Sequence, residues 1–429
     1  MLVIVFAGLL LISSAHAQSE RIIVRDTLGI KGLQTSCLLL GCNVVQSLGD
    51  PLGQIFLVTI PDLLNLNKIL SLLPLQKGIV GIELDQLLGL ANPNLGGIPA
   101  QLEDSLPVNY YGTIVWHGYL TQPANQIIRT SQTQSAFQVS GSGTVALIDT
   151  GIDLTHPALI GSVLPGYDFT RNVADADEKG DVDHSTAAVL DGGGPPQLVT
   201  PSVAAVVSSQ GAAILSQSQY SSFGHGTMTG GLVHLVAPKA KLLPLKAFKA
   251  DGSGYLSDVI RAIYYAVSNN SKVINMSFSF ADSSAELSAA ITYANGKNVI
   301  CVAAAGNSGE KITVYPASLP AVMGVGSTSD SDIQSTFSNY GPQVLWVAAP
   351  GQGITSTYPF GTYASSSGTS FSAPLVSGTA ALLVNISTTV TQSTAAAAIA
   401  HAKWLSADLN NGRLDTYQAV DAWIETVKK

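Results

Sequence analysis

The feature that most constrains the fold is a series of short, almost uniformly apolar runs in the part of the chain after about residue 110. They cover 143–149, 240–248, 271–278, 297–306 and 321–328. Between them, 257–270 and 285–297 have apolar residues at helical spacing and end near Asn or Gly. Strands that are apolar on both sides and separated by helices are typical of a parallel sheet covered on both faces. We therefore predict one α/β domain from about residue 110 onward.

The first part of the chain has a different pattern. In 21–91, the segments RIIVR, CNVVQS, GQIFLVTI and GIVGIEL are strand-like, and LGDPL between the second and third favours a hairpin. DLLNLNKILSLL has helical spacing, and if GLQTSCLLLG is also helical, the order is strand, helix, strand, strand, helix, strand. This order predicts a small α+β ferredoxin-like domain. The Pro- and Gly-bearing stretch 91–109 is interpreted as a linker.

Composition and the N-terminus narrow the function classes. Residues 1–17 combine a short apolar run with Ala15-His16-Ala17, which is typical of a secretory signal peptide. No second membrane anchor is expected after its removal. The formal net charge is −8 with no cluster of Lys or Arg, so a nucleic-acid partner is not expected. Cys37 and Cys42 can pair but their spacing does not demand it, and Cys301 fits a buried core position.

Reactive residues stand beside glycines at the ends of predicted elements. Asp149 ends the run VALID, His225 opens a helix-like stretch in GHGTMTGG, and Ser370 begins a long apolar helix in SGTSFSAP. A serine hydroxyl requires an adjacent base to attack, and a carboxylate holds that base in the useful tautomer. Asn307, in VAAAGNSG, can donate to a developing oxyanion together with the N–H of Ser370. These segments can meet because ligand crevices form at the carboxyl ends of parallel strands.

The order Asp149, His225, Ser370 and the motifs IDTGID, GHGTMTGG and SGTSFSAP resemble those of the subtilisin-like (subtilase) family of serine peptidases, over about residues 115–425. The resemblance implies the subtilisin-like α/β fold and a serine endopeptidase that hydrolyses peptide bonds in protein or peptide substrates through an acyl-enzyme. It implies that Asp149 orients the imidazole, that His225 is general base and then acid, that Ser370 is the nucleophile, and that Asn307 is the oxyanion donor.

The same resemblance implies a domain organisation and a maturation pathway. Residues 1–17 would be the signal peptide, 18–100 a propeptide-like domain with its linker, and 101–429 the peptidase domain. The chain would be a secreted or periplasmic, self-processing zymogen, with its own propeptide as intramolecular inhibitor. We expect the mature enzyme to be a monomer.

Two backbone segments resemble those that hold the substrate as an added strand in this family. With the strand end that carries the oxyanion asparagine, they make up the expected substrate-binding residues, which are Gly252, Ser253, Gly254, Ser277, Phe278, Ser279, Ala304 and Gly306. Ser279 stands where the family favours glycine. We expect its side chain to reshape the primary specificity pocket.

Other departures concern metal and loops. Met228 replaces a histidine that the family usually repeats, and the helix after His225 runs straight into VAPKAKL, without the loop that builds a tight calcium site in many relatives. No cofactor is expected to be required, and the sequence leaves a weaker calcium site open. The alternating acids Asp175, Asp177, Asp181 and Asp183 are interpreted as a solvated loop rather than as calcium ligands. The stretch 189–219 is predicted to be a surface insertion near the cleft.

The sequence bears on two other function classes. An α/β-hydrolase esterase requires GxSxG, whereas Gly368-Thr369-Ser370-Phe371-Ser372 ends in serine and the chain order is wrong. A catalytically inactive homologue that only binds peptides stays as the alternative. The intact set of Asp149, His225, Ser370 and Asn307 argues against it.

Overall fold

The computed structural model describes residues 20–61, 66–90, 99–182, 197–198, 205–206 and 218–429. The predicted signal peptide, residues 1–17, lies outside these ranges. The chain forms two compact units, residues 1–85 and 86–429. Each is described by itself.

The small unit is a four-stranded antiparallel sheet with two helices. Its elements are β1 (Glu20–Asp26), α1 (Gly29–Leu40), β2 (Asn43–Ser47), β3 (Ile55–Ile60), α2 (Leu66–Leu72), η2 (Leu73–Leu75) and β4 (Ile79–Leu84). The strand order is β2-β3-β1-β4. This is the predicted ferredoxin-like arrangement, including the β2–β3 hairpin.

A disulfide closes the end of α1. Cys37 and Cys42, which the sequence left open, are bonded to each other across Gly41, whose φ of 84° ends the helix in the left-handed conformation. Both cysteines belong to the apolar cluster that joins α1 to one face of the sheet. The bridge thereby joins the helix end to the start of β2.

The large unit is built on an eight-stranded sheet in the order β10-β9-β13-β8-β15-β16-β17-β18. Its strands are β8 (Thr144–Asp149), β9 (Tyr167–Asp168), β10 (Val173–Ala174), β13 (Lys241–Lys246), β15 (Val273–Met276), β16 (Ile300–Ala304), β17 (Met323–Thr328) and β18 (Val347–Pro350). All neighbours are parallel except β10 and β9. The predicted parallel sheet is confirmed, and each of the five apolar runs forms one of its strands.

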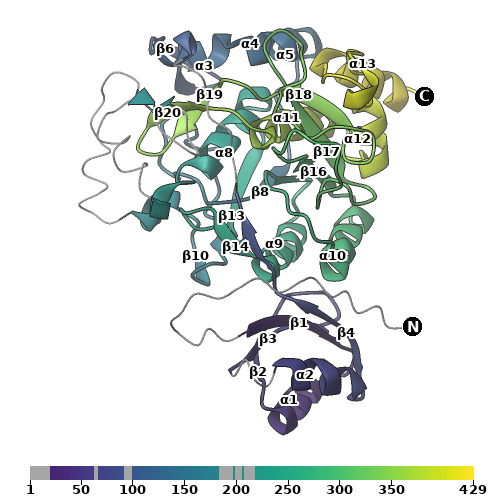
Figure 1. Ribbon diagram of the computed structural model, residues 1–429. Coiled ribbons are helices and arrows are strands. Elements are labelled where there is room, and N and C mark those ends of the chain that lie inside the picture. Colours follow the sequence, from purple (N-terminus) through teal and green to yellow (C-terminus); the bar gives the residue numbers. More distant parts are fainter. Residues whose placement is uncertain (1–19, 62–65, 91–98, 183–196, 199–204, 207–217) are drawn as a thin grey trace. The chain divides into compact units, whose positions relative to one another are not determined.

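Helices cover both faces of this sheet (Figure 1). On one face, α8 (His225–Val236) packs on α11 (Thr369–Ile386); on the other, α9 (Leu256–Ser268) packs on α10 (Ala285–Gly296). Val145 and Leu147 of β8 belong to the apolar core shared with α8 and α11, whereas Ala146 and Ile148 do not. Successive side chains of β8 thus point to opposite faces of the sheet. α11 is long and apolar enough to cross a bilayer, but 89% of its apolar window is buried inside this unit.

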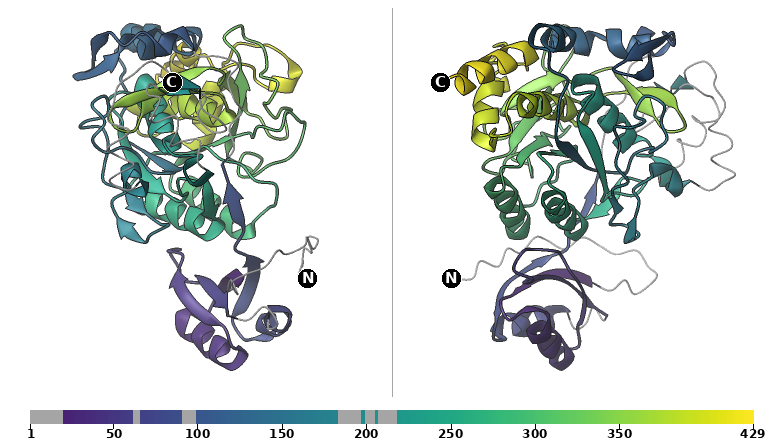
Figure 2. Two further views of the ribbon diagram at one scale, coloured as in Figure 1. Left: turned by 60° about the vertical axis from the view of Figure 1, so that its left-hand side comes forward. Right: turned by 180° about the vertical axis from the view of Figure 1, so that it is seen from behind.

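The remaining elements surround this centre. They are β5 (Leu87–Gly89), η3 (Ala100–Leu102), β6 (Pro107–Tyr110), β7 (Thr113–Trp116), α3 (His117–Thr121), α4 (Pro123–Ile127), α5 (Thr130–Phe137), η4 (Glu178–Asp181), β11 (Gln197–Leu198), β12 (Ala205–Val206), η5 (Ser218–Tyr220), β14 (Ser253–Tyr255), β19 (Ile354–Tyr358), β20 (Thr362–Ser366), α12 (Gln392–Ile399), η6 (Ala407–Leu409) and α13 (Thr416–Val427). Figure 2 shows α12 and α13, in yellow, packed together beside the sheet.

Two loop predictions need correction or restriction. The stretch 91–109 is not a linker throughout, because η3 and the start of the β6–β7 hairpin lie within it. The predicted insertion 189–219 lies mostly outside the described residues. Its described parts, β11 and β12, form a hairpin that extends β20 in an antiparallel sheet, so this stretch contributes strands to the larger unit.

Part of the acidic stretch 175–183 is ion-paired in the structure. Asp181 contacts Lys246, whose Nζ lies 2.6 Å from Oδ2, and Arg171 at 3.5 Å. Lys246 is completely buried and also donates to the carbonyls of Thr150 and Phe248. Interpreting this stretch as solvated was therefore wrong for Asp181, because a buried lysine requires a charged partner. Asp183 lies outside the described residues.

A buried histidine in α8 predicts a pH-dependent loss of stability. His234 is 1% exposed, and neither ring nitrogen has a hydrogen-bond partner among the described residues. Burial lowers the pKa of His234 to about 4. Between about pH 6.5 and pH 4 the unfolded chain therefore binds a proton that the folded chain does not, and stability falls as the pH falls. The loss is on the order of 3 kcal/mol.

We expect His234→Leu to reduce this acid sensitivity. The measurement is the free energy of unfolding by urea at several pH values from 4 to 7, on the Ser370→Ala background, which lacks the expected nucleophile. His401→Gln, at an exposed position, is the matched control. An equal slope of stability against pH for all three proteins would contradict the prediction.

Candidate active site

Asp149 is the last residue of β8, and the strand directs its side chain toward α8. It follows Val145 and Leu147 on the same face, and it is 1% exposed. Its Oδ1 accepts hydrogen bonds from the N–H of Thr150 at 2.8 Å and from Nδ1 of His225 at 2.6 Å. Its Oδ2 accepts from the hydroxyl of Thr229 at 3.1 Å. These donors compensate the burial of a charged carboxylate.

His225 is the first residue of α8 and lies against Asp149. Gly224, before it, has φ of 89°, and a Cβ there would lie 1.9 Å from the ring of Tyr358, so only glycine fits this turn. Because Nδ1 faces a carboxylate acceptor, it carries the proton, and Nε2 is the free acceptor of the neutral ring. Nε2 is buried and has no hydrogen-bond partner among the described residues.

Ser370 is the second residue of α11, the helix that packs on α8, and the ring of Phe371 next to it lies 5.5 Å from the His225 ring. The hydroxyl of Ser370 does not bind Nε2 of His225, the base that the sequence assigns to it. Instead, Oγ of Ser370 donates to the carbonyl of Ser277 at 2.9 Å. A hydroxyl has one proton to donate. It must therefore leave the Ser277 carbonyl before Nε2 of His225 can accept it.

Asn307 is tied to the residue before the nucleophile. Its Oδ1 accepts from both the N–H and the hydroxyl of Thr369, each at 2.9 Å. This fixes the amide, because only the oxygen can accept from an N–H group, and Nδ2 is left as the donating side. The N–H of Ser370 is one of the first four of α11, which have no acceptor within the helix. The two predicted oxyanion donors are thus attached to the same short segment.

The first predicted substrate segment is already paired with a strand of the chain itself. Ser253 and Gly254 belong to β14, which pairs antiparallel with β5, and the N–H of Leu90 donates to the carbonyl of Gly252. Gly252 has φ of 82°, and a Cβ there would lie 2.5 Å from Oγ of Ser222, whose carbonyl accepts from the N–H of His225. This edge therefore lies next to the turn that carries the histidine.

The second segment follows β15 and neighbours the end of β16. Ser277 contacts Ser370 twice, since its hydroxyl also donates to the Ser370 carbonyl at 2.8 Å. The side chain of Phe278 packs between Phe248 and Phe280, so only its backbone is available to a substrate. Ala304 ends β16.

Gly306 follows two residues after Ala304, and a Cβ on it would lie 2.8 Å from Oγ of Ser279. The hydroxyl that stands in the usual glycine position thus faces the expected pocket wall.

Sequence reasoning missed the residues that support Asp149 and His225. Thr150, Thr227 and Thr229 lie within IDTGID and GHGTMTGG, and these motifs were the signal that could have identified them. Glu178 gave no such signal, because it reaches the site from another part of the chain. Its carboxylate accepts from Thr150, Thr227 and the N–H of Gly224.

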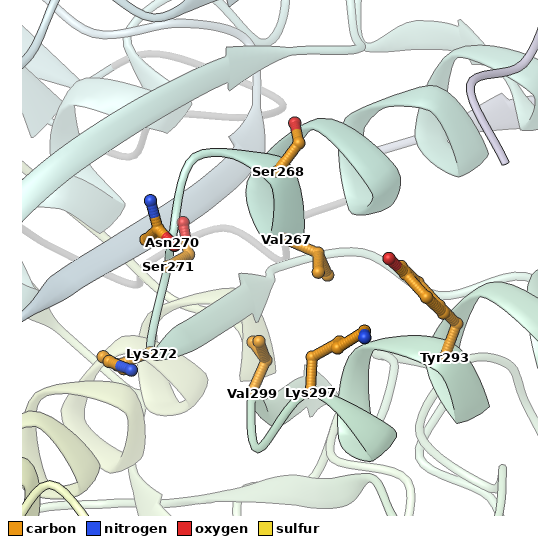
Figure 3. Close-up of a pocket in the computed structure, with 8 residues that line it drawn as sticks. All are labelled: Val267, Ser268, Asn270, Ser271, Lys272, Tyr293, Lys297 and Val299. Atoms are coloured by element: carbon orange, nitrogen blue, oxygen red, sulfur yellow. The ribbon is translucent and has the colours of Figure 1, made fainter. Parts of the chain in front are cut away.

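A hollow on the large unit does not coincide with this site (Figure 3). It has a volume of about 240 Å³ and lies between the end of α9, the C-terminal part of α10 and the residues that precede β15 and β16. The side chains of Lys297 and Tyr293 lie side by side along it. It opens at the amino ends of the strands, whereas Asp149 and Ala304 mark the carboxyl ends, where ligands bind in such sheets.

Comparison with known proteins agrees with the geometry. The profile of the subtilase family of peptidases matches residues 141–420. A thermophilic serine proteinase of Bacillus sp. (strain AK1) is 35% identical over 63% of this chain and 58% of its own length. Thermitase of Thermoactinomyces vulgaris is 37% identical over 57% of this chain and 76% of its own length. Subtilisin BL of Lederbergia lenta is 39% identical over 37% of this chain and 62% of its own length.

The matched profile begins before Asp149 and ends after Ser370, so it includes all four predicted catalytic residues. The chain spans a little over half the length of the Bacillus relative. With an eight-stranded, mostly parallel sheet and a buried Asp–His pair at its carboxyl edge, the chain belongs to the subtilase family of serine-type peptidases.

Proposed function

We propose that this protein is a secreted serine endopeptidase that cleaves protein or peptide substrates with Asp149, His225 and Ser370. The observation that carries the proposal is the 2.6 Å bond between Nδ1 of His225 and Oδ1 of Asp149. It leaves Nε2 as a proton acceptor at the start of α8, beside α11, whose second residue is Ser370.

The proposed reaction has two halves. Nε2 of His225 takes the proton of Ser370 as Oγ attacks the peptide carbonyl, and Asp149 stabilises the imidazolium that forms. The oxyanion receives hydrogen bonds from Nδ2 of Asn307 and the N–H of Ser370. His225 then protonates the leaving amine, which leaves an acyl-enzyme on Ser370. Water, activated by the same imidazole, hydrolyses this ester and restores the serine.

We expect Asn307→Ala to lower kcat by about 10²–10³ with little change in KM, because the donor acts on charge that develops only in the transition state. Steady-state kinetics with a peptide amide substrate test this. Asn339→Ala is unsuitable as a control, because Asn339 accepts from the N–H of Ser308, next to Asn307. Asn411→Ala, at a distant loop where the amide donates to the Trp346 carbonyl, is suitable. A change in KM alone would contradict the oxyanion role.

We also propose that residues 18–100 act as a propeptide and intramolecular inhibitor, after a signal peptide at 1–17, and that 101–429 form a monomeric peptidase domain. Supporting this, β5 lies on β14 as an added strand, which is how a peptide substrate would bind. Its Leu88 is 5% exposed, whereas Leu87 on the other side is 68% exposed. A side chain buried beside β14 is expected of a segment held in a substrate subsite.

Incubation of the purified full-length chain tests both proposals. We expect it to cut itself after Leu90 and before η3, between residues 90 and 100, as read by N-terminal sequencing of the product. A synthetic peptide of residues 79–90 should then inhibit the mature enzyme competitively. A chain that neither cuts itself nor cleaves an added peptide, yet binds that peptide, would establish the alternative of an inactive peptide-binding homologue.

A further inference from the structure

A second buried carboxylate lies behind the proposed catalytic pair. Glu178 is completely buried, in η4, and a hydrogen-bonded backbone holds it there: its N–H donates to the carbonyl of Ile152, and the N–H of Ile152 donates to the carbonyl of Ala176. The chain around Glu178 is therefore paired with the segment that directly follows Asp149.

Four donors converge on this carboxylate. Oε1 accepts from the N–H of Gly224 at 2.7 Å and from the hydroxyl of Thr150; Oε2 accepts from the N–H of Thr227 at 3.1 Å and from its hydroxyl at 2.6 Å. Gly224 and Thr227 flank His225 at the start of α8. Glu178 thus caps the helix end that carries the histidine, where a negative charge is stabilising.

The hydrogen-bond pattern also fixes which groups donate. The Thr150 hydroxyl accepts from the N–H of Gly226 at 2.9 Å, and the Thr227 hydroxyl accepts from the N–H of Asp153 at 2.8 Å. Their single protons are therefore available to Glu178, which is arranged as an acceptor on all four bonds and hence as an anion. The hydroxyl oxygen of Thr150 also lies 3.3 Å from Oδ1 of Asp149. Thr150 therefore connects the carboxylates of Glu178 and Asp149.

Several effects act on the pKa of Glu178 in opposite directions. Burial raises this pKa to about 7, and the negative charge of Asp149 also raises it. The hydrogen bonds from Thr150 and Thr227 and the positive charge of Lys246 lower it. From β19, the phenol of Tyr358 also faces this region. A protonated Glu178 would have to release one donor. Of the two hydroxyls, that of Thr150 has a second acceptor within reach, which is the Asp149 oxygen that binds His225.

We infer that Glu178 is a positioning residue of the catalytic site, which holds His225 through the start of α8 and acts on Asp149 through the Thr150 hydroxyl. The inference rests on the proposed function. Glu178 would be a fourth side chain beside the proposed triad of Asp149, His225 and Ser370. It lies 29 positions after Asp149 and 47 before His225 in the sequence. Its negative charge favours the imidazolium that forms during the reaction.

The test compares Glu178→Gln, Thr150→Val and Thr150→Ser with the wild type. The Gln side chain keeps the shape but removes the charge and brings an N–H₂ group to a place where every neighbour donates. We expect kcat to fall about 10-fold with KM changed less than about two-fold. Loss of a nearby negative charge disfavours the imidazolium, so the acidic limb of the kcat/KM profile should move to lower pH.

Thr150→Val should change kcat and the pH profile in the same directions, and Thr150→Ser, which keeps the hydroxyl, should recover most of what Thr150→Val loses. Glu286→Gln, at a buried carboxylate of α10, controls for the loss of a buried charge and should lower only the melting temperature. An active Glu178→Gln enzyme with wild-type kcat and pH profile would overturn the inference.

Should Glu178→Gln fail to mature, the two Thr150 variants provide the test. Equal kinetics for Thr150→Val and Thr150→Ser would also overturn the inference. An inactive wild-type chain, in contrast, would refute the proposed function itself, so the two failures are distinguishable.

Discussion

Replacing Ser370 by alanine is expected to abolish self-processing of the full-length chain and to leave it intact as a single species. The hydroxyl is the only atom of this residue that can form the covalent intermediate, and loss of the nucleophile of a triad lowers kcat by about 10⁶. The measurement is the band pattern of the purified protein over hours, together with labelling by a serine-directed phosphonyl reagent. Both signals should be lost.

Ser372→Ala is the matched control for this change. Ser372 is buried in the same first turns of α11, but its hydroxyl donates to the carbonyls of Ala349 and Pro350, outside the network of Asp149 and His225. This variant should process itself and react with the reagent. Continued self-processing by Ser370→Ala would remove Ser370 from the mechanism.

Replacing Asp149 by alanine is expected to lower kcat by about 10⁴, the second largest effect. His225 would lose both the acceptor that fixes its tautomer and the charge that stabilises its protonated form. Burst and steady-state kinetics on a peptide ester and the corresponding amide measure this loss. A decrease of less than about 10-fold would be inconsistent with the assigned role of Asp149.

Asp149→Asn separates orientation from charge in this chain. The hydroxyl of Thr229 lies 3.1 Å from Oδ2 of Asp149 and 3.0 Å from the Gly226 carbonyl. It can therefore donate to Gly226 and accept from an asparagine N–H₂, which leaves the amide oxygen facing Nδ1 of His225. We expect this variant to retain more activity than Asp149→Ala. Adding Thr229→Val to it should remove that advantage.

The sheet and the small domain could be predicted from sequence because burial determines where apolar residues stand along the chain. Strands covered on both faces are apolar throughout, so β8, β13, β15, β16 and β17 were visible as apolar runs. The proposed catalytic residues stand out in the sequence because each lies in a short motif at an element end, where glycine permits a turn that other residues cannot make. Asp149 and His225 are 76 positions apart, yet the topology brings their motifs together.

Features that depend on long-range contacts could not be predicted from the local sequence. β19 and β20 are rich in Ser and Thr, among them Ser356 and Thr357, whose hydroxyls donate to buried carbonyls, so their composition does not indicate a core strand. The position of Glu178 depends on pairing with the loop after Asp149, and the orientation of the Ser370 hydroxyl depends on the Ser277 carbonyl. Side-chain direction and non-local pairing are decided by the packed structure and not by spacing.

The pairing of β5 with β14 has a consequence for how activity would begin. A segment joined covalently to the enzyme reaches its groove at an effective concentration in the millimolar range, well above that of most dissolved competitors. Added peptides would then scarcely slow the first turnover, and the lag before activity appears would not depend on how dilute the protein is. Only after the segment is severed and departs would the enzyme respond to substrates in solution.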